Sequence, residues 1–277
     1  MDISVVMSVY KSEKADYLDR ALQSVSTDQT LKPKEIVLVI DGEIGDELRK
    51  VVNDWKDKLQ KSFIVHQNPK NLGLTKSLNI AIGLSSGDLI ARMDSDDIST
   101  PDRFEKQVAY LLSHESISVV GGSIQEFSST NPCLKVRHYP QNMETIRNYI
   151  CKASPLAHPS VMMRRSMFDV VKYDERYRMS QDIALWYDAL CAGFSLGNID
   201  DVVLLFRREG DVYKRRGKQK AFNEFKIYMN GIRRFYGLIS WRYVYPLSRL
   251  AFRLMPTWII KRIYDSKMRQ KMLTSKE

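Results

Sequence analysis

The chain has 277 residues, of which 44% are apolar and 27% are charged, and its formal net charge at pH 7 is +10. This length suffices for one sizeable domain with an appendage, and the spread of aliphatic and aromatic residues along it excludes a disordered chain. The three cysteines, Cys133, Cys151 and Cys191, form no CxxC pair, so they indicate neither a zinc site nor a disulfide framework.

The first third of the chain alternates apolar runs rich in β-branched residues with segments of helical periodicity. We expect strands at 3–10, 35–40, 63–66 and 88–93 and, between them, helices at 16–25, 46–59 and 74–85. This order predicts an α/β fold with a mainly parallel, Rossmann-like open sheet flanked by helices. Ligands of such sheets bind at the carboxyl ends of the strands, where the chain turns out of the sheet.

Acidic residues follow the second and fourth expected strands. Asp41 ends the second, and Asp94, Asp96 and Asp97 stand within four positions just after the fourth. Asp is a common turn residue, but three acids this close repel one another unless a cation neutralises them. The pattern therefore favours a site for Mg²⁺ or Mn²⁺ that is shared with substrate phosphates.

The segment after this cluster has the pattern of a helix over 101–112. Thr100 is its expected N-cap, and Pro101 would occupy the first helical position. Because Thr100 already supplies the cap, helix capping does not explain the acidic residues before it.

Several stretches, in this order, resemble the inverting glycosyltransferases of family 2, which have the GT-A fold. The stretches are SVVMSVYKSE, VLVIDG, NPKNLGLTKSLNIAIGLSSGDLIARMDSDDISTPDRFEKQ, HPSVMMRRS, YDERYRMSQDIALWYDAL and DVYKRRG. The resemblance covers most of the chain and is strongest to bacterial enzymes that build O-antigen, capsule or exopolysaccharide repeat units. It implies a catalytic domain over 1–217, with a nucleotide-binding half at 1–100 and an acceptor-binding half at 101–217. A basic, amphipathic helical region follows at 218–277.

The resemblance implies roles for the acidic residues on the donor side. Asp41 matches the acid that binds the base of the nucleotide, and Asp94 matches the first acid of the DxD motif, which faces the ribose and the nucleotide. Asp96 matches the ligand of the metal, and Asp97 is expected to assist at the metal or at the donor sugar. A divalent cation, Mn²⁺ or Mg²⁺, stabilises the charge that develops on a departing nucleoside diphosphate.

The acceptor side requires a general base. Asp182, in SQDIALW, matches the base that removes the proton from the acceptor hydroxyl, and Gln181 stands where the family more often has Glu. Asp182 also fits as the N-cap of the helix that follows it. Direct displacement with a single base implies inversion, so an α-linked donor would give a β-linkage.

Other residues have a binding and a structural interpretation. Lys76 and Asn79 lie in a region that the family uses beside the nucleotide, although an ordinary amphipathic helix explains them equally well. His158 faces the diphosphate or the acceptor in one interpretation and is a buried structural residue in the other. The basic residues suited to closing over the diphosphate are Arg207, Arg208, Lys214, Arg215 and Arg216. Each of them is also explained as a solvated surface residue.

The positive charge is concentrated at the carboxyl end, where residues 207–277 carry 19 Lys and Arg against 5 Asp and Glu. The segment WRYVYPLSRLAFRLMPTWIIKRIYDSKMRQK, interrupted by Pro246 and Pro256, mixes apolar and basic residues in the manner of an interfacial amphipathic element. The alternative is that its apolar stripe packs on the catalytic domain. No signal peptide is recognisable, and no apolar run reaches the roughly 18 residues that span a bilayer. We expect a cytoplasmic protein that is peripheral on the cytoplasmic face of the inner membrane.

These features together predict a hexosyltransferase. The expected donor is a UDP-hexose, with galactose or glucose favoured, and the expected acceptor is a sugar on a polyprenyl diphosphate. A rhamnosyltransferase that uses a dTDP-sugar is the alternative within this class. A sugar nucleotidyltransferase would need a Gly- and Arg-rich loop after the first strand, which SVYKSEKADY lacks. Nucleic-acid binding would explain the basic end but neither the acidic cluster nor Asp182, so we expect no nucleic acid as a partner.

Overall fold

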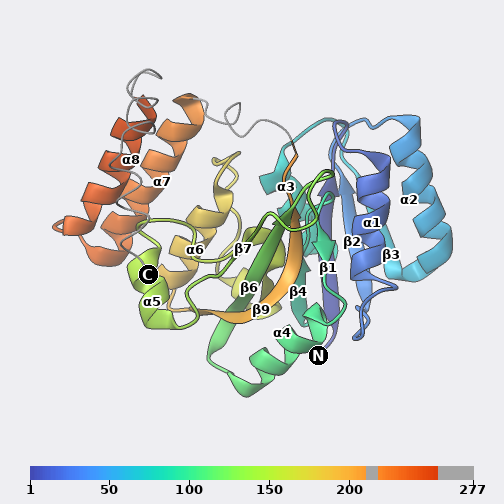
Figure 1. Cartoon of the computed structure of the whole chain (residues 1–277), viewed down its shortest axis with the longest axis horizontal. Coiled ribbons are helices and arrows are strands. Elements are labelled where there is room, and N and C mark those ends of the chain that lie inside the picture. The colour runs from blue at the N-terminus through green and yellow to red at the C-terminus, as the bar shows by residue number, and fades with distance from the viewer. Residues whose placement is uncertain (210–217, 255–277) are drawn as a thin grey trace. The chain divides into compact units, whose positions relative to one another are not determined.

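The structure, a computed structural model, describes residues 1–209 and 218–254 (Figure 1). Residues 1–210 and 211–277 form two compact units, which we call the N-terminal unit and the C-terminal unit. The strands are β1 (Ile3–Val9), β2 (Glu35–Ile40), β3 (Phe63–Gln67), β4 (Leu89–Arg92), β5 (Ile98–Ser99), β6 (Ile117–Phe127), β7 (Lys135–Arg137), β8 (Met162–Arg164) and β9 (Ser195–Arg207). The helices of the N-terminal unit are α1 (Ala15–Val25), α2 (Asp46–Leu59), α3 (Leu74–Leu84), α4 (Arg103–Ser113), α5 (Met143–Tyr149) and α6 (Gln181–Cys191).

The strands of the described residues form one mixed sheet. Its strand order is β3-β2-β1-β4-β8-β6-β9-β5. The short strand β7 stands outside this order and pairs with β6. β1 pairs in parallel with β2 and β4, and β2 pairs in parallel with β3, so this half has the β-α-β connections that the sequence predicts. In the other half, β8 runs antiparallel to β4 and β6, while β9 runs parallel to β6 and antiparallel to β5. The predicted strands and helices of residues 1–93 are confirmed to within one residue at each boundary.

The apolar runs of the parallel strands are buried because helices cover the sheet. Val5, Met7 and Val9 of β1 belong to one core cluster with Leu18 of α1 and Leu48 of α2. The helices α1 and α2 lie side by side (Figure 1). α3 packs on β1 and β2 and covers the side chains that alternate to the other face. This two-sided burial explains why these strands appear in the sequence as continuous apolar runs.

The register of the parallel strands brings their carboxyl ends to one edge. Val9 pairs with Ile40, and Val6 pairs with Arg92. The backbone N–H of Asp41 donates to the carbonyl of Val9 at 2.8 Å, so Asp41 leaves the sheet beside the chain that follows β1. The acidic residues after β4 emerge at the same edge, as expected for a ligand site in such a sheet.

Helix α4 begins later than the sequence predicts. It starts at Arg103, and Asp102 occupies the N-cap position instead of Thr100. The reason is that residues 98–99 form β5, and the N–H of Thr100 still donates to the carbonyl of Val203 in β9 at 3.1 Å. The sheet therefore keeps the chain extended through Thr100, and a turn precedes the helix.

The described residues of the C-terminal unit include the helices α7 (Lys218–Tyr236) and α8 (Val244–Leu254), which lie side by side (Figure 1). They run antiparallel, because Arg249 donates to the hydroxyl of Tyr228 at 3.3 Å and Arg253 lies 3.0 Å from Glu224. Pro246 falls in the first turn of α8, where its missing N–H has no helical partner to lose, so it does not interrupt the helix as the sequence suggested. Pro256 lies outside the described residues. In the part of the chain that the structure describes, no helix has the length and hydropathy needed to cross a bilayer.

Candidate active site

The acidic residues after β4 form a compact cluster. One carboxylate oxygen from each of Asp94, Asp96 and Asp97 lies within 4.8 Å of the others. The chain turns between β4 and β5, so these side chains converge instead of alternating across a strand. Asp97 is buried, and Asp94 and Asp96 are half-buried.

The electrostatics of this cluster suit a divalent cation. Burial, together with the charges of Asp94 and Glu13, raises the pKa of Asp96 to about 6. Burial and the charges of Asp94 and Asp96 raise the pKa of Asp97 well above its ordinary value. Among the described residues, the buried Oδ2 of Asp97 has no hydrogen-bond partner. Mg²⁺ and Mn²⁺ take carboxylate oxygens as ligands and would neutralise this repulsion, so the residues fit such an ion.

Two buried arginines support the cluster, and the sequence analysis identified neither. Arg92 donates from Nη1 to Oδ2 of Asp94 at 2.7 Å and from Nη2 to Oδ1. Arg103 donates from Nη2 to the carbonyls of Arg92 (2.8 Å) and Val161 (3.2 Å). Burying a guanidinium is unfavourable unless anions or carbonyls satisfy it. The available signal was an arginine at the end of an apolar run, directly before acidic residues.

Arg207, expected over the diphosphate, contacts the acidic loop itself. Its backbone N–H donates to Oδ1 of Asp97 at 2.8 Å, and its Nε donates to the carbonyl of Asp96 at 2.7 Å. The centre of its guanidinium lies 3.8 Å from the ring centroid of Tyr17 and 4.5 Å from that of Phe127. The end of β9 therefore fixes the turn that carries the acids.

Asp41 holds the loop that precedes α3. Its Oδ1 accepts from Nδ2 of Asn68 (3.0 Å) and from the N–H of Leu72 (2.7 Å), and its Oδ2 accepts from the N–H of Gly73 (2.9 Å). A carboxylate offers about four acceptor positions, so one remains for a ligand.

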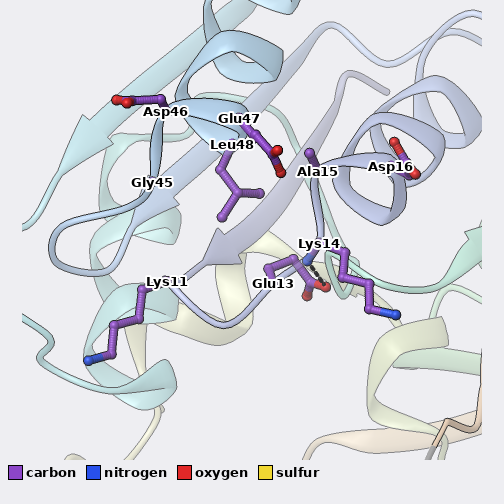
Figure 2. A pocket seen from close by; sticks show the side chains of 9 residues that line it. All are labelled: Lys11, Glu13, Lys14, Ala15, Asp16, Gly45, Asp46, Glu47 and Leu48. Carbon is purple, nitrogen blue, oxygen red and sulfur yellow. Dashed lines mark hydrogen bonds between the residues drawn. The ribbon is translucent and has the colours of Figure 1, made fainter.

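A cavity of about 590 Å³ opens at this edge of the sheet, lined by Lys11, Glu13 and Lys14 after β1 and by residues 45–48 after β2. Figure 2 shows Glu13 between the two lysines, where it accepts from the N–H of Lys14 at 2.9 Å. The other oxygen of Glu13 accepts from the hydroxyl of Ser95 at 2.7 Å, so the cavity adjoins the acidic loop. Glu13 is not predictable from the sequence, because its proximity to Ser95 depends on the fold.

Lys76 and Asn79 join α3 to the segment before α6. The amide of Asn79 donates to the carbonyl of Tyr173 at 2.9 Å and accepts from its N–H at 3.2 Å. Nζ of Lys76 lies 3.7 Å from Oε2 of Glu175, and both side chains are exposed. In this structure Asn79 therefore has the structural explanation that the sequence left open.

Asp182 lies near the start of α6 and is half-buried. Ser180 occupies the N-cap position and α6 begins at Gln181, so Asp182 is not the N-cap. The hydroxyl of Ser154 donates to Oδ2 of Asp182 at 3.2 Å, and Nε1 of Trp186 donates to the same hydroxyl at 3.3 Å. Burial raises the pKa of Asp182. Ser154 was missed because a serine so far away in sequence carries no signal for this contact.

His158 is buried behind these residues. Its Nε2 lies 2.6 Å from the hydroxyl of Tyr173, and its ring meets Trp186 edge-on, with 6.2 Å between centroids. Burial, followed by the positive charge of Arg92, lowers the pKa of His158 well below its ordinary value. A neutral imidazole packed between aromatic rings is the structural interpretation of this residue.

The remaining basic residues divide into two groups. Arg208 donates to Oε2 of Glu126 at 2.7 Å, and Arg137 pairs with the other oxygen of this buried carboxylate. The structure thus assigns Arg208 a partner within the sheet. The predicted Lys214, Arg215 and Arg216 lie outside the described residues.

The positive charge of Arg92 acts on residues of both the donor side and the acceptor side of the candidate site. Burial is the largest cause of the pKa shifts of Asp96, Asp97, His158, Tyr173 and Asp182, and the positive charge of Arg92 acts to lower the pKa of each. The charges of Asp94 and Asp182 also act together on Tyr173. The charge of Arg92 therefore acts both on the cation-suited acidic cluster and on the half-buried Asp182.

A mixed open sheet with such a cluster at the ends of its parallel strands is typical of glycosyltransferases of the GT-A class. The family model described as Glycosyl transferase family 2 matches residues 4–171, and the chain belongs to this family.

Relatives and solved structures agree with this assignment. "Amylovoran biosynthesis glycosyltransferase AmsE" of Erwinia amylovora is 31% identical over 95% of this chain and 97% of its own. The "UDP-Gal:alpha-D-GlcNAc-diphosphoundecaprenol beta-1,3-galactosyltransferase" of Escherichia coli is 30% identical over 96% of both chains. TarS of S. aureus, solved in complex with UDP-GlcNAc, has a TM-score of 0.64 at 20% identity, covering 92% of this chain and 72% of that one. The last likeness shows the fold.

Proposed function

We propose that the protein is an inverting hexosyltransferase that moves galactose or glucose from a UDP-linked donor to a sugar on a lipid diphosphate, in the synthesis of bacterial O-antigen or capsule repeat units. One observation carries this proposal: Asp94, held by Arg92, converges with Asp96 and Asp97 on an acidic cluster suited to a divalent cation. The relative from E. coli, whose name specifies UDP-Gal and a lipid-linked GlcNAc, supports the choice of donor and acceptor.

On the donor side, Asp96 and Asp97 would hold Mg²⁺ or Mn²⁺, and Asp94, fixed by Arg92, would face the nucleotide. When bound, the cation stabilises the negative charge of the leaving diphosphate. Asp41 keeps one acceptor position for an N–H of the nucleotide base while it fixes the 68–73 loop. Arg207 positions the acidic turn, and the predicted Lys214, Arg215 and Arg216 remain the candidates for contact with the diphosphate.

On the acceptor side, Asp182 is the proposed general base. The acceptor oxygen attacks the anomeric carbon as the bond from that carbon to the diphosphate oxygen breaks, and the hydroxyl proton passes to the carboxylate of Asp182. Ser154 orients this carboxylate through its 3.2 Å hydrogen bond. Displacement from the face opposite the leaving group inverts the configuration at the anomeric carbon.

The proposal includes the location of the enzyme. A lipid-linked acceptor lies at the membrane, whereas a nucleotide sugar is supplied from the cytoplasm. We therefore propose a catalytic domain over 1–217 and a basic region over 218–277 that holds the enzyme, as a peripheral protein, on the inner leaflet.

The decisive experiment measures transfer from UDP-galactose, UDP-glucose, UDP-GlcNAc and dTDP-rhamnose to a synthetic GlcNAc-diphosphate-lipid with Mn²⁺ or Mg²⁺. We expect β-linked transfer from UDP-galactose or UDP-glucose, abolished by a chelator and by Asp182→Asn. The matched control is Asp169→Asn, which changes an exposed acid. If transfer occurred from dTDP-rhamnose alone, the donor would be a dTDP-sugar instead of a UDP-hexose. Unchanged turnover in Asp182→Asn would refute the assignment of Asp182 as the general base.

A further inference from the structure

The connection between α7 and α8 is an ordered turn. Gly237, with φ of +89°, ends α7, and its N–H donates to the carbonyl of Arg233 at 3.1 Å. The hydroxyl of Tyr243 donates to the carbonyl of Gly237 at 3.0 Å. Ser240 caps the short 3₁₀ turn Trp241–Tyr243 by accepting from the N–H of Arg242. Local hydrogen bonds therefore fix the backbone of this turn.

This connection and the first residues of α8 present large apolar side chains to solvent. The exposed fractions are 78% for Leu238, 100% for Ile239, 65% for Trp241, 53% for Val244 and 51% for Leu247. We call these five residues the apolar tip. Five such side chains within ten positions are unusual for a surface in water and mark a site of interaction.

The described helices that carry the apolar tip, together with the turn between them, are rich in basic residues. Residues 218–254 contain eight Lys and Arg and a single acid, Glu224, which pairs with Arg249 and Arg253. The guanidinium of Arg242 lies over the ring of Trp241, 5.3 Å from its centroid. Apolar side chains beside arginines, with a tryptophan among them, match the boundary between lipid headgroups and acyl chains.

We infer that the apolar tip is the element that inserts into the headgroup region of an anionic bilayer, with the flanking arginines bound to lipid phosphates. The inference rests on the proposed function only in its choice of a lipid surface over a protein partner. It assigns membrane contact to residues 238–247, which form the connection between α7 and α8 and the start of α8, whereas composition alone pointed to the whole carboxyl-terminal segment. An insertion of this kind is shallow and does not require a spanning helix.

Vesicle flotation of the full chain tests this inference. We expect the wild type to float with vesicles of phosphatidylcholine and phosphatidylglycerol in equal parts, and to bind pure phosphatidylcholine less. The combined change Leu238→Ser, Ile239→Ser and Trp241→Ser should lower the partition coefficient roughly tenfold or more, because it removes most of the insertable apolar area. The matched control, Leu112→Ser with Val170→Ser, removes two exposed apolar side chains of the N-terminal unit and should not alter flotation.

A second measurement locates the contact. In a chain carrying Trp258→Phe, lipids brominated near the headgroup should quench the fluorescence of Trp241, because Trp55 and Trp186 are buried. The further change Trp241→Phe should remove this quenching. Equal flotation of the wild type and the triple variant would overturn the inference, as would no flotation of the wild type or a lack of quenching.

The assignment of the apolar tip can fail independently of the proposed function. Turnover on a short-chain, water-soluble GlcNAc-diphosphate acceptor does not require a membrane, so the triple variant should retain it. That activity also shows that the variant folds. Absence of transfer by the wild type from every donor would refute the function and leave the vesicle result intact.

Discussion

Arg92 holds both carboxylate oxygens of Asp94 although its own side chain is almost fully buried. The backbone carbonyl of Arg92 also accepts from Nη2 of Arg103, so a second buried guanidinium supports the backbone from which Arg92 reaches Asp94. A buried ion pair contributes little net stability relative to apolar residues, but removal of one partner leaves the other charge uncompensated.

We therefore predict that Arg92→Met lowers the free energy of unfolding by about 3 kcal/mol and abolishes transfer. Urea unfolding measures the first effect, and the transfer assay measures the second. The matched control is Arg20→Met, because Arg20 pairs with Asp28 at 2.5 Å at a solvent-exposed position. That change should cost at most about 1 kcal/mol. Equal losses for the two variants would contradict the structural role given to Arg92.

A second prediction concerns the metal. The pKa of Asp96 is raised to about 6 by burial and by the charges of Asp94 and Glu13, so ionisation of Asp96 is less favourable in the fold than in the unfolded chain, although the carboxylate predominates at neutral pH. Asp96→Ala should leave the metal-free protein within about 1 kcal/mol of the wild type. Mn²⁺ should raise the Tm of the wild type but not that of the variant, and transfer should fall about 100-fold or more. If Mn²⁺ raised the Tm of the wild type and of the variant equally, Asp96 would not be a ligand of the metal.

A third prediction separates two roles of Arg207. A contact with the diphosphate by charge alone would largely survive Arg207→Lys, whereas the packing between Tyr17 and Phe127 requires a planar guanidinium. We expect this variant to weaken Mn²⁺ binding about tenfold, as the loss of a group that orients metal ligands does. Titration calorimetry measures the affinity. The control, Arg164→Lys, changes an arginine that donates to the carbonyls of Ile117 and Leu111 and should bind Mn²⁺ as the wild type does.

The parallel half of the fold was predictable because each element carries its own periodic signal. The predicted boundaries of β2 and α2 agree with the structure, since apolar runs and helical spacing are local properties. The strands after α4 gave no comparable signal. β6 contains Gly121 and Gly122, which weaken a strand pattern, yet a Cβ at Gly121 would overlap the side chain of Asn198 in β9. Long-range pairing of β6 with β9 requires these glycines, and local sequence does not contain that information.

The residues of the candidate site likewise divide into those that local sequence motifs predict and those that only the fold reveals. Asp41, the acids at 94–97 and Asp182 stand in motifs that a sequence displays. Arg92 and Ser154 were missed because their importance depends on burial and on contacts made by distant segments. Thr100 was misassigned as a cap because pairing of β5 with β9 overrides the local preference.

The last prediction follows from the environment of Asp182. Burial raises its pKa, so the carboxylate takes up a proton at a higher pH than an ordinary aspartate. A base must be ionised to accept the acceptor proton, and kcat/KM should therefore fall as the pH decreases, with a midpoint above the ordinary range for aspartate. The pH profile of transfer, measured with Mn²⁺ at saturation, tests this expectation.

The variant Ser154→Ala tests whether Asp182 is the group that controls the acid limb of this pH profile. The hydroxyl of Ser154 donates to Asp182 and favours its ionised form, so loss of the donor should move the acid midpoint to still higher pH. Asp169→Asn, which changes an exposed acid, should leave the midpoint in place. A midpoint that is insensitive to Ser154→Ala would mean that a group other than Asp182 controls the acid limb, and the assignment of the base would then fail even if the enzyme transferred hexose as proposed.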